Sequence, residues 1–194
     1  AAAGQWHAEK AVGDTRKFNV VYGDVNIGAR GKDFFAMFSK GKGGLISLVY
    51  RGKEYITRVP RFIFSRAYTD NDRGMGAPLS DSGWIAATAG ISYVQDSFRA
   101  EETKGCLKVS MEYEAKYPEV FRCTKEYEID AAGTLKIRLR YPGIQKEKYL
   151  PLFGLEMKLK KENDRFSYYG LGPDENYADR KCGARLGVYN CTPQ

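Results

Sequence analysis

Two clusters of carboxylates and amides, each gathered around one arginine, are the parts of this sequence whose residue types and spacing could do chemistry. The first begins at Arg66 and ends with Asp70, Asn71 and Asp72, directly after the apolar stretch 62–64. An arginine in such a loop can brace it through bidentate pairs with carboxylates, while asparagine side chains satisfy loop backbone groups. The same groups can instead contact a polyol such as a sugar. For each residue taken singly, bracing is the simpler interpretation.

The second cluster lies near the end of the chain. It runs from residue 169 to residue 180, and its members are Glu175, Asn176, Tyr177, Asp179 and Arg180. Buried carboxylates are tolerable only when they are paired. We therefore predict that the two clusters lie together at one end of the fold. At least one arginine–carboxylate pair should link or brace them, with Asn71 or Asn176 bonded to loop backbone.

Other catalytic and metal-binding patterns are weak. A serine or cysteine nucleophile needs a nearby base, usually histidine, and the only histidine is His7. The four cysteines form no Cys-x-x-Cys pair, which argues against zinc, and residues 70–74 lack the ligand spacing of a calcium loop. We expect no metal or cofactor in this chain. Free thiols favour a reducing compartment and hence the cytoplasm, with the periplasm left open.

The composition is that of a globular protein with a basic balance. Of the 194 residues, 43% are hydrophobic and 28% are charged, and the formal net charge is +7. Nucleic-acid binding needs basic residues clustered on one face, whereas here they are scattered and often stand beside acids, as in Lys125–Glu126. No apolar run approaches the roughly 20 residues of a membrane span. We therefore expect neither a nucleic-acid partner nor a membrane partner.

The elements that must position the two clusters are strands. Apolar and polar residues alternate through most of the chain, which is typical of antiparallel strands with one buried and one solvated face. Lys125 is an exception to the alternation, and turns are predicted at 40–44, 51–53 and 130–133. The predicted strands occupy residues 18–22, 25–27, 34–38, 46–50, 107–117, 121–129 and 135–141. The sequence therefore predicts an all-β, antiparallel fold.

Three irregular features interrupt this pattern. One helix is predicted from Asp81 or Ser82 to Gly90, because either residue can cap it and the glycine can end it. The stretch 67–83 is otherwise predicted to be a loop, and loops of this length are usually functional or lie at an interface. The alternation slips by one residue at Phe153–Gly154, which predicts a β-bulge there.

At the two clusters the sequence resembles the C-terminal β-domain, or small-chain domain, of glycoside hydrolase family 2 β-galactosidases. Residues 66–72 match that domain's Arg-Ala-x-x-Asp-Asn-Asp, and residues 169–180 match its Tyr-Gly-x-Gly-Pro-x-Glu-Asn-Tyr-x-Asp-Arg. Residues 150–154 are similar to its Leu-Pro-Arg-Ile-Gly, although Leu152 stands where the family has arginine. The resemblance extends approximately from residue 18 to residue 189.

This resemblance implies a fold and a domain organisation. The fold is an antiparallel supersandwich of large sheets, similar to that of galactose mutarotase. The family domain continues past the equivalent of residue 189, so we expect this chain to be incomplete at its C-terminal end. Residues 1–17 are expected to be a leader or remnant, and residues 18–194 the truncated small-chain domain.

The resemblance also implies a supporting role. Retaining glycoside hydrolysis needs two carboxylates roughly 5 Å apart, and in the family both are glutamates on a separate (β/α)8 barrel that also binds magnesium. The family's acid/base follows an asparagine, and this sequence contains no Asn-Glu dipeptide. We therefore expect a non-catalytic part of a β-galactosidase that completes the active-site wall, where residues of the two clusters border the mouth or brace its loops. Its partners would be the parent's remaining domains and, through them, a galactoside.

Three other classes stay open. An independent carbohydrate-binding module would present exposed aromatic residues, and the 14 tyrosines allow this, although most alternate into strand faces. A mutarotase-like epimerase would need a catalytic histidine with a glutamate, and His7 lies outside the strand pattern. The third class is a basic structural protein with no link to sugars.

Overall fold

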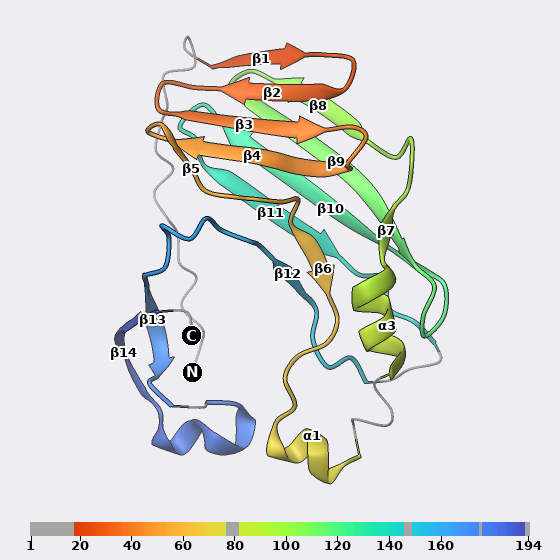
Figure 1. The fold of residues 1–194 in the computed structure, drawn as a ribbon, viewed down its shortest axis with the longest axis vertical. Helices are drawn as coiled ribbons and strands as arrows, with labels where there is room; N and C mark the ends of the chain where they lie inside the picture. The colour runs from red at the N-terminus through yellow and green to blue at the C-terminus, as the bar shows by residue number, and fades with distance from the viewer. Residues whose placement is uncertain (1–17, 77–81, 146–148, 175, 193–194) are drawn as a thin grey trace. The chain divides into compact units, whose positions relative to one another are not determined.

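The computed structural model describes residues 18–76, 82–145, 149–174 and 176–192 (Figure 1). The expected leader lies outside these residues, as do His7 and Glu175. The chain divides into two compact units, Ala1–Lys158 and Leu159–Gln194, and each is described by itself. No helix in the described part is long and apolar enough to cross a membrane.

The first sheet is a five-stranded antiparallel meander in which consecutive strands are neighbours. Its strands are β1 (Asn19–Tyr22), β2 (Asn26–Arg30), β3 (Phe34–Ser39), β4 (Gly44–Tyr50) and β5 (Lys53–Glu54). The predicted turn at 40–44 joins β3 to β4, and Gly43 there has a φ of 63°, which favours glycine. The strand register shifts between Met37 and Phe38, so this sheet carries a bulge that the sequence did not indicate.

The second sheet contains the long alternating strands. Its order is β11 (Leu135–Arg140), β10 (Phe121–Asp130), β9 (Cys106–Ala115) and β7 (Ser92–Tyr93), and β8 (Arg99–Thr103) also pairs with β9. All of these pairings are antiparallel. Every second side chain of β9 and β10 is buried, as the sequence alternation requires. The predicted all-β, antiparallel class is confirmed.

The two sheets pack against each other within the first unit (Figure 1). The ring of Phe38 on β3 lies 5.3 Å from that of Tyr127 on β10, and both side chains are fully buried. The hydroxyl of Tyr113 on β9 donates to the carbonyl of Gly43, and that of Tyr50 donates to the carbonyl of Gly133. Burying a large apolar side chain stabilises a fold by about 1.5–3 kcal/mol, so this shared layer is the main source of stability.

A third layer of structure leads to the first polar cluster. The short strand β6 (Arg61–Ile63) pairs with β12 (Gly154–Glu156), and helix α3 (Ser82–Gly90) follows where the sequence predicted it. Phe64 and Trp84 pack with Phe121 of β10, with ring centroids 5.3–6.0 Å apart.

Two local predictions for this region are wrong. A short helix, α1 (Asp70–Gly74), stands where a loop was predicted, because Thr69 caps it. At Phe153–Gly154 there is no bulge. β12 begins at Gly154, so the slip in alternation marks the change from loop to strand.

The second unit is a hairpin with a short helical segment. Strands β13 (Phe166–Gly172) and β14 (Arg185–Cys191) pair antiparallel over their full length, and η2 (Ala178–Gly183) lies between them. The rings of Tyr168 and Tyr189 lie 5.4 Å apart on one face. A Cβ atom at Gly172 would lie 2.5 Å from the Tyr168 hydroxyl, so the glycine lets these rings approach the backbone.

Candidate functional site

Strand β6 leads directly into the first cluster. Phe64, the residue after β6, is fully buried, and its backbone N–H donates to Oγ1 of Thr88 on α3 at 2.9 Å. The chain then turns into α1 at Thr69. The Thr69 hydroxyl accepts from the backbone N–H of Asp72, and the Asp72 carboxylate accepts from the backbone N–H of Thr69 at 2.8 Å. This reciprocal capping box satisfies two backbone donors that would otherwise lack partners.

Asp72 is the centre of the cluster. Only 4% of its side chain is exposed. In addition to the Thr69 N–H, its carboxylate accepts from Nη2 of Arg66 at 3.0 Å and from the hydroxyl of Tyr149 at 2.9 Å. A buried charge is stable only when such partners surround it, so Asp72 acts here as a brace.

Arg66 and Tyr149 connect this brace to a distant part of the chain. The Nε of Arg66 donates to the carbonyl of Pro151 at 3.0 Å, and Nε1 of Trp84 on α3 donates to the carbonyl of Tyr149 at 2.9 Å. The segment 149–151 thus fixes both the guanidinium and the helix. Residues 66–72 and 150–154, two of the motifs recognised in the sequence, therefore meet in one network.

The contacts around Asp72 favour the ionised form of its carboxyl group. The hydrogen bond from the Thr69 backbone lowers the pKa of the Asp72 carboxyl, and this outweighs the opposing effect of burial. The hydroxyls of Tyr149 and Thr69 and the charge of Arg66 lower that pKa further. Burial and the bond to Asp72 raise the pKa of Tyr149. The carboxylate is therefore held ionised and the phenol neutral, which suits positioning better than proton transfer.

The other members of the first cluster face solvent. Asp70 and Asn71 are both exposed on α1. Nη1 of Arg73 lies 3.5 Å from Oδ1 of Asp70, and both of those side chains are about two-thirds exposed. The cluster thus has a buried half that fixes the helix and an exposed half that carries a carboxylate and an amide at the surface.

The second cluster has a different construction. Nδ2 of Asn176 donates to the carbonyl of Leu171 at 2.7 Å and so ties the loop to the end of β13. The guanidinium of Arg180 lies 5.8 Å over the ring of Tyr177, and the backbone N–H of Arg180 donates to the carbonyl of Tyr177. Asp179 lies within η2.

The two clusters belong to different compact units, and Glu175 lies outside the described residues. Their common location at one end of the fold stays a prediction.

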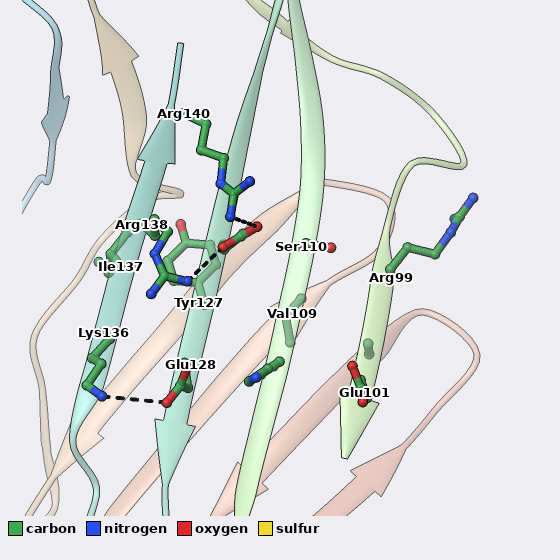
Figure 2. A pocket seen from close by; sticks show the side chains of 13 residues that line it. Arg99, Glu101, Val109, Ser110, Tyr127, Glu128, Lys136, Ile137, Arg138 and Arg140 are labelled. Atoms are coloured by element: carbon green, nitrogen blue, oxygen red, sulfur yellow. Dashed lines mark hydrogen bonds and ion pairs between the residues drawn. The ribbon is translucent and has the colours of Figure 1, made fainter. Parts of the chain in front are cut away.

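A polar hollow of about 680 Å³ lies on the solvated face of the second sheet (Figure 2). One row of side chains crosses four neighbouring strands with alternating charge, namely Glu101, Lys108, Glu128 and Lys136. Figure 2 also shows the paired groups: Lys136 with Glu128 at 3.6 Å, and both Arg138 and Arg140 with Glu126 at 3.1 and 3.6 Å. The hollow carries more basic than acidic side chains, and the cross-strand ion pairs among them support the pairing of the strands.

No cluster of three or more histidine, cysteine or acidic side chains suited to a metal is found among the described residues.

Comparison with known proteins decides the family. A family model described as β-galactosidase small chain matches residues 30–194. The chain belongs to the β-galactosidase small-chain family. A β-galactosidase of Clostridium acetobutylicum is 44% identical over 178 residues, which are 91% of this chain and 19% of that protein. A β-galactosidase of Lactobacillus delbrueckii subsp. bulgaricus is 38% identical over 88% of this chain and 17% of its own length. A β-galactosidase small subunit of Latilactobacillus sakei is 32% identical over 91% of this chain and 61% of its own length.

The small-chain match includes both polar clusters, because each lies between residues 30 and 194. The chain nevertheless spans only about a fifth of the length of the long relatives. Sequence reasoning missed two members of the network, Thr69 and Tyr149. Thr69 carries a recognisable signal, since an acidic residue follows it three positions later. Tyr149 stands next to the motif at 150–154, but its bond to Asp72 spans 77 residues and has no local signature.

Proposed function

We propose that this chain is the non-catalytic small-chain part of a retaining glycoside hydrolase family 2 β-galactosidase, where it completes the wall of the active site. The observation that carries the proposal is the Asp72 network. It fixes α1 rigidly through Arg66 and Tyr149 while it leaves Asp70 and Asn71 at the surface. A carboxylate and an amide held on a braced helix suit hydrogen bonding at the mouth of a sugar pocket.

The partners follow from the same proposal. The remaining polypeptide of a longer β-galactosidase would supply both catalytic glutamates and the magnesium site, on its barrel domain. The galactoside would meet this chain only through that parent. The name of the Latilactobacillus sakei relative, a small subunit, supports an arrangement in which such a chain works beside another polypeptide. Free thiols at all four cysteines are compatible with a cytoplasmic enzyme.

A segment exchange tests this function. In the 44%-identical enzyme of Clostridium acetobutylicum, the matched 178-residue segment would be replaced by the corresponding residues of this chain. We expect the chimera to hydrolyse a chromogenic β-galactoside and the 194-residue chain alone to hydrolyse none. A folded deletion variant that keeps full activity without the segment would refute the supporting role, as would turnover by the isolated chain.

Three point variants in the chimera distinguish residues that border the pocket from the residue that braces α1. Replacing exposed Asp70 or Asn71 by alanine should raise KM for the galactoside without lowering the melting temperature. Replacing buried Asp72 by asparagine should instead lower the melting temperature of the chimera. If Asp70→Ala and Asn71→Ala both leave KM and kcat unchanged, α1 does not border the pocket.

A further inference from the structure

Lys125 lies on the core face of the second sheet, and the proposed function gives it no role. Lys125 occupies the centre of β10, and no part of its side chain is exposed. Cross-strand neighbours on either side are Met111 of β9 and Leu139 of β11. A lysine here carries a large desolvation cost unless its surroundings compensate for it.

Among the described residues, the amine of Lys125 contacts polar groups and aromatic rings but no negatively charged group. Its Nζ donates to the carbonyl of Pro60 and, at 3.2 Å, to the hydroxyl of Tyr113. It also lies 4.2 Å from the centre of the Tyr113 ring and 4.9 Å from that of Phe62. Within the described residues, Lys125 forms no ion pair. Ring faces and a carbonyl favour an ammonium, but more weakly than a carboxylate would.

The bond from Lys125 to Pro60 acts on the strand that leads to the first polar cluster. Pro60 is buried and directly precedes β6, and the chain continues from the end of β6 to Arg66. β6 pairs with β12 over only three residues. Such a short pairing positions a strand poorly by itself, so the amine contributes substantially to holding it against β10.

We propose that Lys125 is a proton-sensitive anchor, which joins β10 to the start of β6 and changes its hold on that strand when its amine gains or loses a proton. Both forms of the amine donate to the Pro60 carbonyl and lie against the two ring faces. The cation–π attraction favours the ammonium, but burying it without a counter-charge costs more, so protonation weakens the hold on β6.

The titratable groups around the anchor are few. Tyr113 is the one in contact, and Tyr93 of β7 packs on its ring at 6.0 Å. Cys123 and Tyr127 lie on the same face of β10, two residues to either side. Burial raises the pKa of Tyr113 and of Tyr127, and raises that of Cys123 to about 12. These three groups therefore stay neutral in the folded protein throughout the neutral range.

Charged groups also lie on β6, on its partner strand β12 and just before β6. Arg61 on β6 and Glu156 on β12 pair with each other at 2.7 Å, and both are partly exposed. Arg58 also contacts Glu156. The carboxylate is thus occupied by two arginines, and the amine of Lys125 is the group that can change its charge near neutral pH.

The sign of the pH effect follows from the two end states. Burial lowers the pKa of Lys125 to about 7, whereas an unfolded lysine keeps its proton up to about pH 10.4. Through pH 7 and above, the folded chain loses this proton while the unfolded chain keeps it, so the folded state gains stability as the pH rises. The unfolding constant falls about threefold per pH unit at pH 7, where half of the folded amines are charged, and this slope approaches tenfold about one unit higher. The unfolded thiol of Cys123, with an ordinary pKa of about 8.5, opposes the gain as it ionises, so the useful window is about pH 7–8.

Titration of the unmodified 194-residue chain tests the proton. With lysines labelled at Cε and Nζ, we expect the NMR signal of Lys125 to titrate near pH 7. A chain in which every lysine titrates above pH 10 overturns the proposal. This measurement needs no variant and so does not depend on whether a variant folds.

Matched variants test the anchor. Lys125→Met should remove the rising slope of stability between pH 7 and 8, whereas Lys108→Met, at an exposed position on β9, should keep it. Amide protection in β6 should fall in Lys125→Met and stay unchanged in the β1–β2 hairpin. If the slope persists in Lys125→Met, or if β6 keeps its full protection, the proposal is wrong. None of these outcomes depends on galactosidase activity.

Discussion

Replacing Asp72 by asparagine is the sharpest perturbation of the first cluster, because it keeps the shape of the side chain and removes its charge. The carboxylate accepts from the Thr69 backbone, the Tyr149 hydroxyl and the Arg66 guanidinium at 2.8–3.0 Å. An asparagine retains one acceptor oxygen, and its NH2 group faces a donor at the other position. At least one donor in the network then loses its acceptor.

The size of the effect follows from these contacts. A hydrogen bond to a charged group contributes about 1.5–3 kcal/mol, and a buried donor left without an acceptor costs about 1–3 kcal/mol. Arg66 is one-third exposed and regains water when its partner changes, which reduces the loss. We expect Asp72→Asn to lower the free energy of unfolding by about 2–3 kcal/mol.

Urea unfolding followed by the fluorescence of Trp84 is a suitable assay, because this side chain is buried and bonded to the backbone of Tyr149. With a denaturant slope of about 1–3 kcal/mol per molar, the midpoint should fall by about 0.7–3 M. Asp70→Asn on the same helix is the matched control, since Asp70 is exposed, and it should shift the midpoint little. Equal midpoints for Asp72→Asn and the unmodified chain would refute the bracing role.

The pH dependence gives an independent check on the same residue. The pKa of Asp72 is lowered in the folded state, so the unfolded chain takes up its proton first as the pH falls. The contribution of Asp72 is fully present above the unfolded pKa of about 3.9 and is lost as the pH drops through the folded value. Asp72→Asn should therefore lose stability less steeply below pH 4 than the unmodified chain. Parallel acid-unfolding curves would contradict this.

Three smaller predictions concern other contacts. Tyr149→Phe removes the hydroxyl bonded to Asp72 and should cost about 1 kcal/mol in urea unfolding. Gly172→Ala places a Cβ 2.5 Å from the Tyr168 hydroxyl and should loosen the β13–β14 hairpin, which amide exchange of those strands would detect. Arg122→Ala breaks two exposed ion pairs with Glu112 and Glu114 and should change the melting temperature far less than Asp72→Asn, as differential scanning calorimetry can show.

The long strands were predictable because their pattern is local. In β9 and β10 the apolar residues alternate without a break except at Lys125, and a period of two leaves one choice of buried face. The alternation places Lys125 inside, while its residue type argued against burial. The contact that resolves this conflict, with Pro60, spans 65 residues and leaves no trace in the sequence near either residue.

The short elements were less predictable for a related reason. α1 has five residues, too few to show a helical period, and it forms because Thr69 and Asp72 cap each other. The bond from Tyr149 to Asp72 closes a loop of 77 residues. Residue types alone identified Arg66 and Asp72 as candidates for a brace, but they did not identify the third and fourth partners, because those partners depend on how the sheets fold around them.

The Asp72 network and the amine of Lys125 act on the same short strand from opposite ends. β6 is held at its start by the bond between Lys125 and Pro60, and beyond its end by the Arg66–Asp72 pair and by the bond from Phe64 to Thr88. Apolar packing fixes how deeply the strand is buried, but it is not directional, whereas these hydrogen bonds fix its position along and around its axis. Their pH ranges differ, because Asp72 loses its charge only in acid and Lys125 changes near neutrality. The direction in which α1 presents Asp70 and Asn71 should therefore be held most firmly above neutral pH, where Asp72 is charged and the buried amine of Lys125 is neutral.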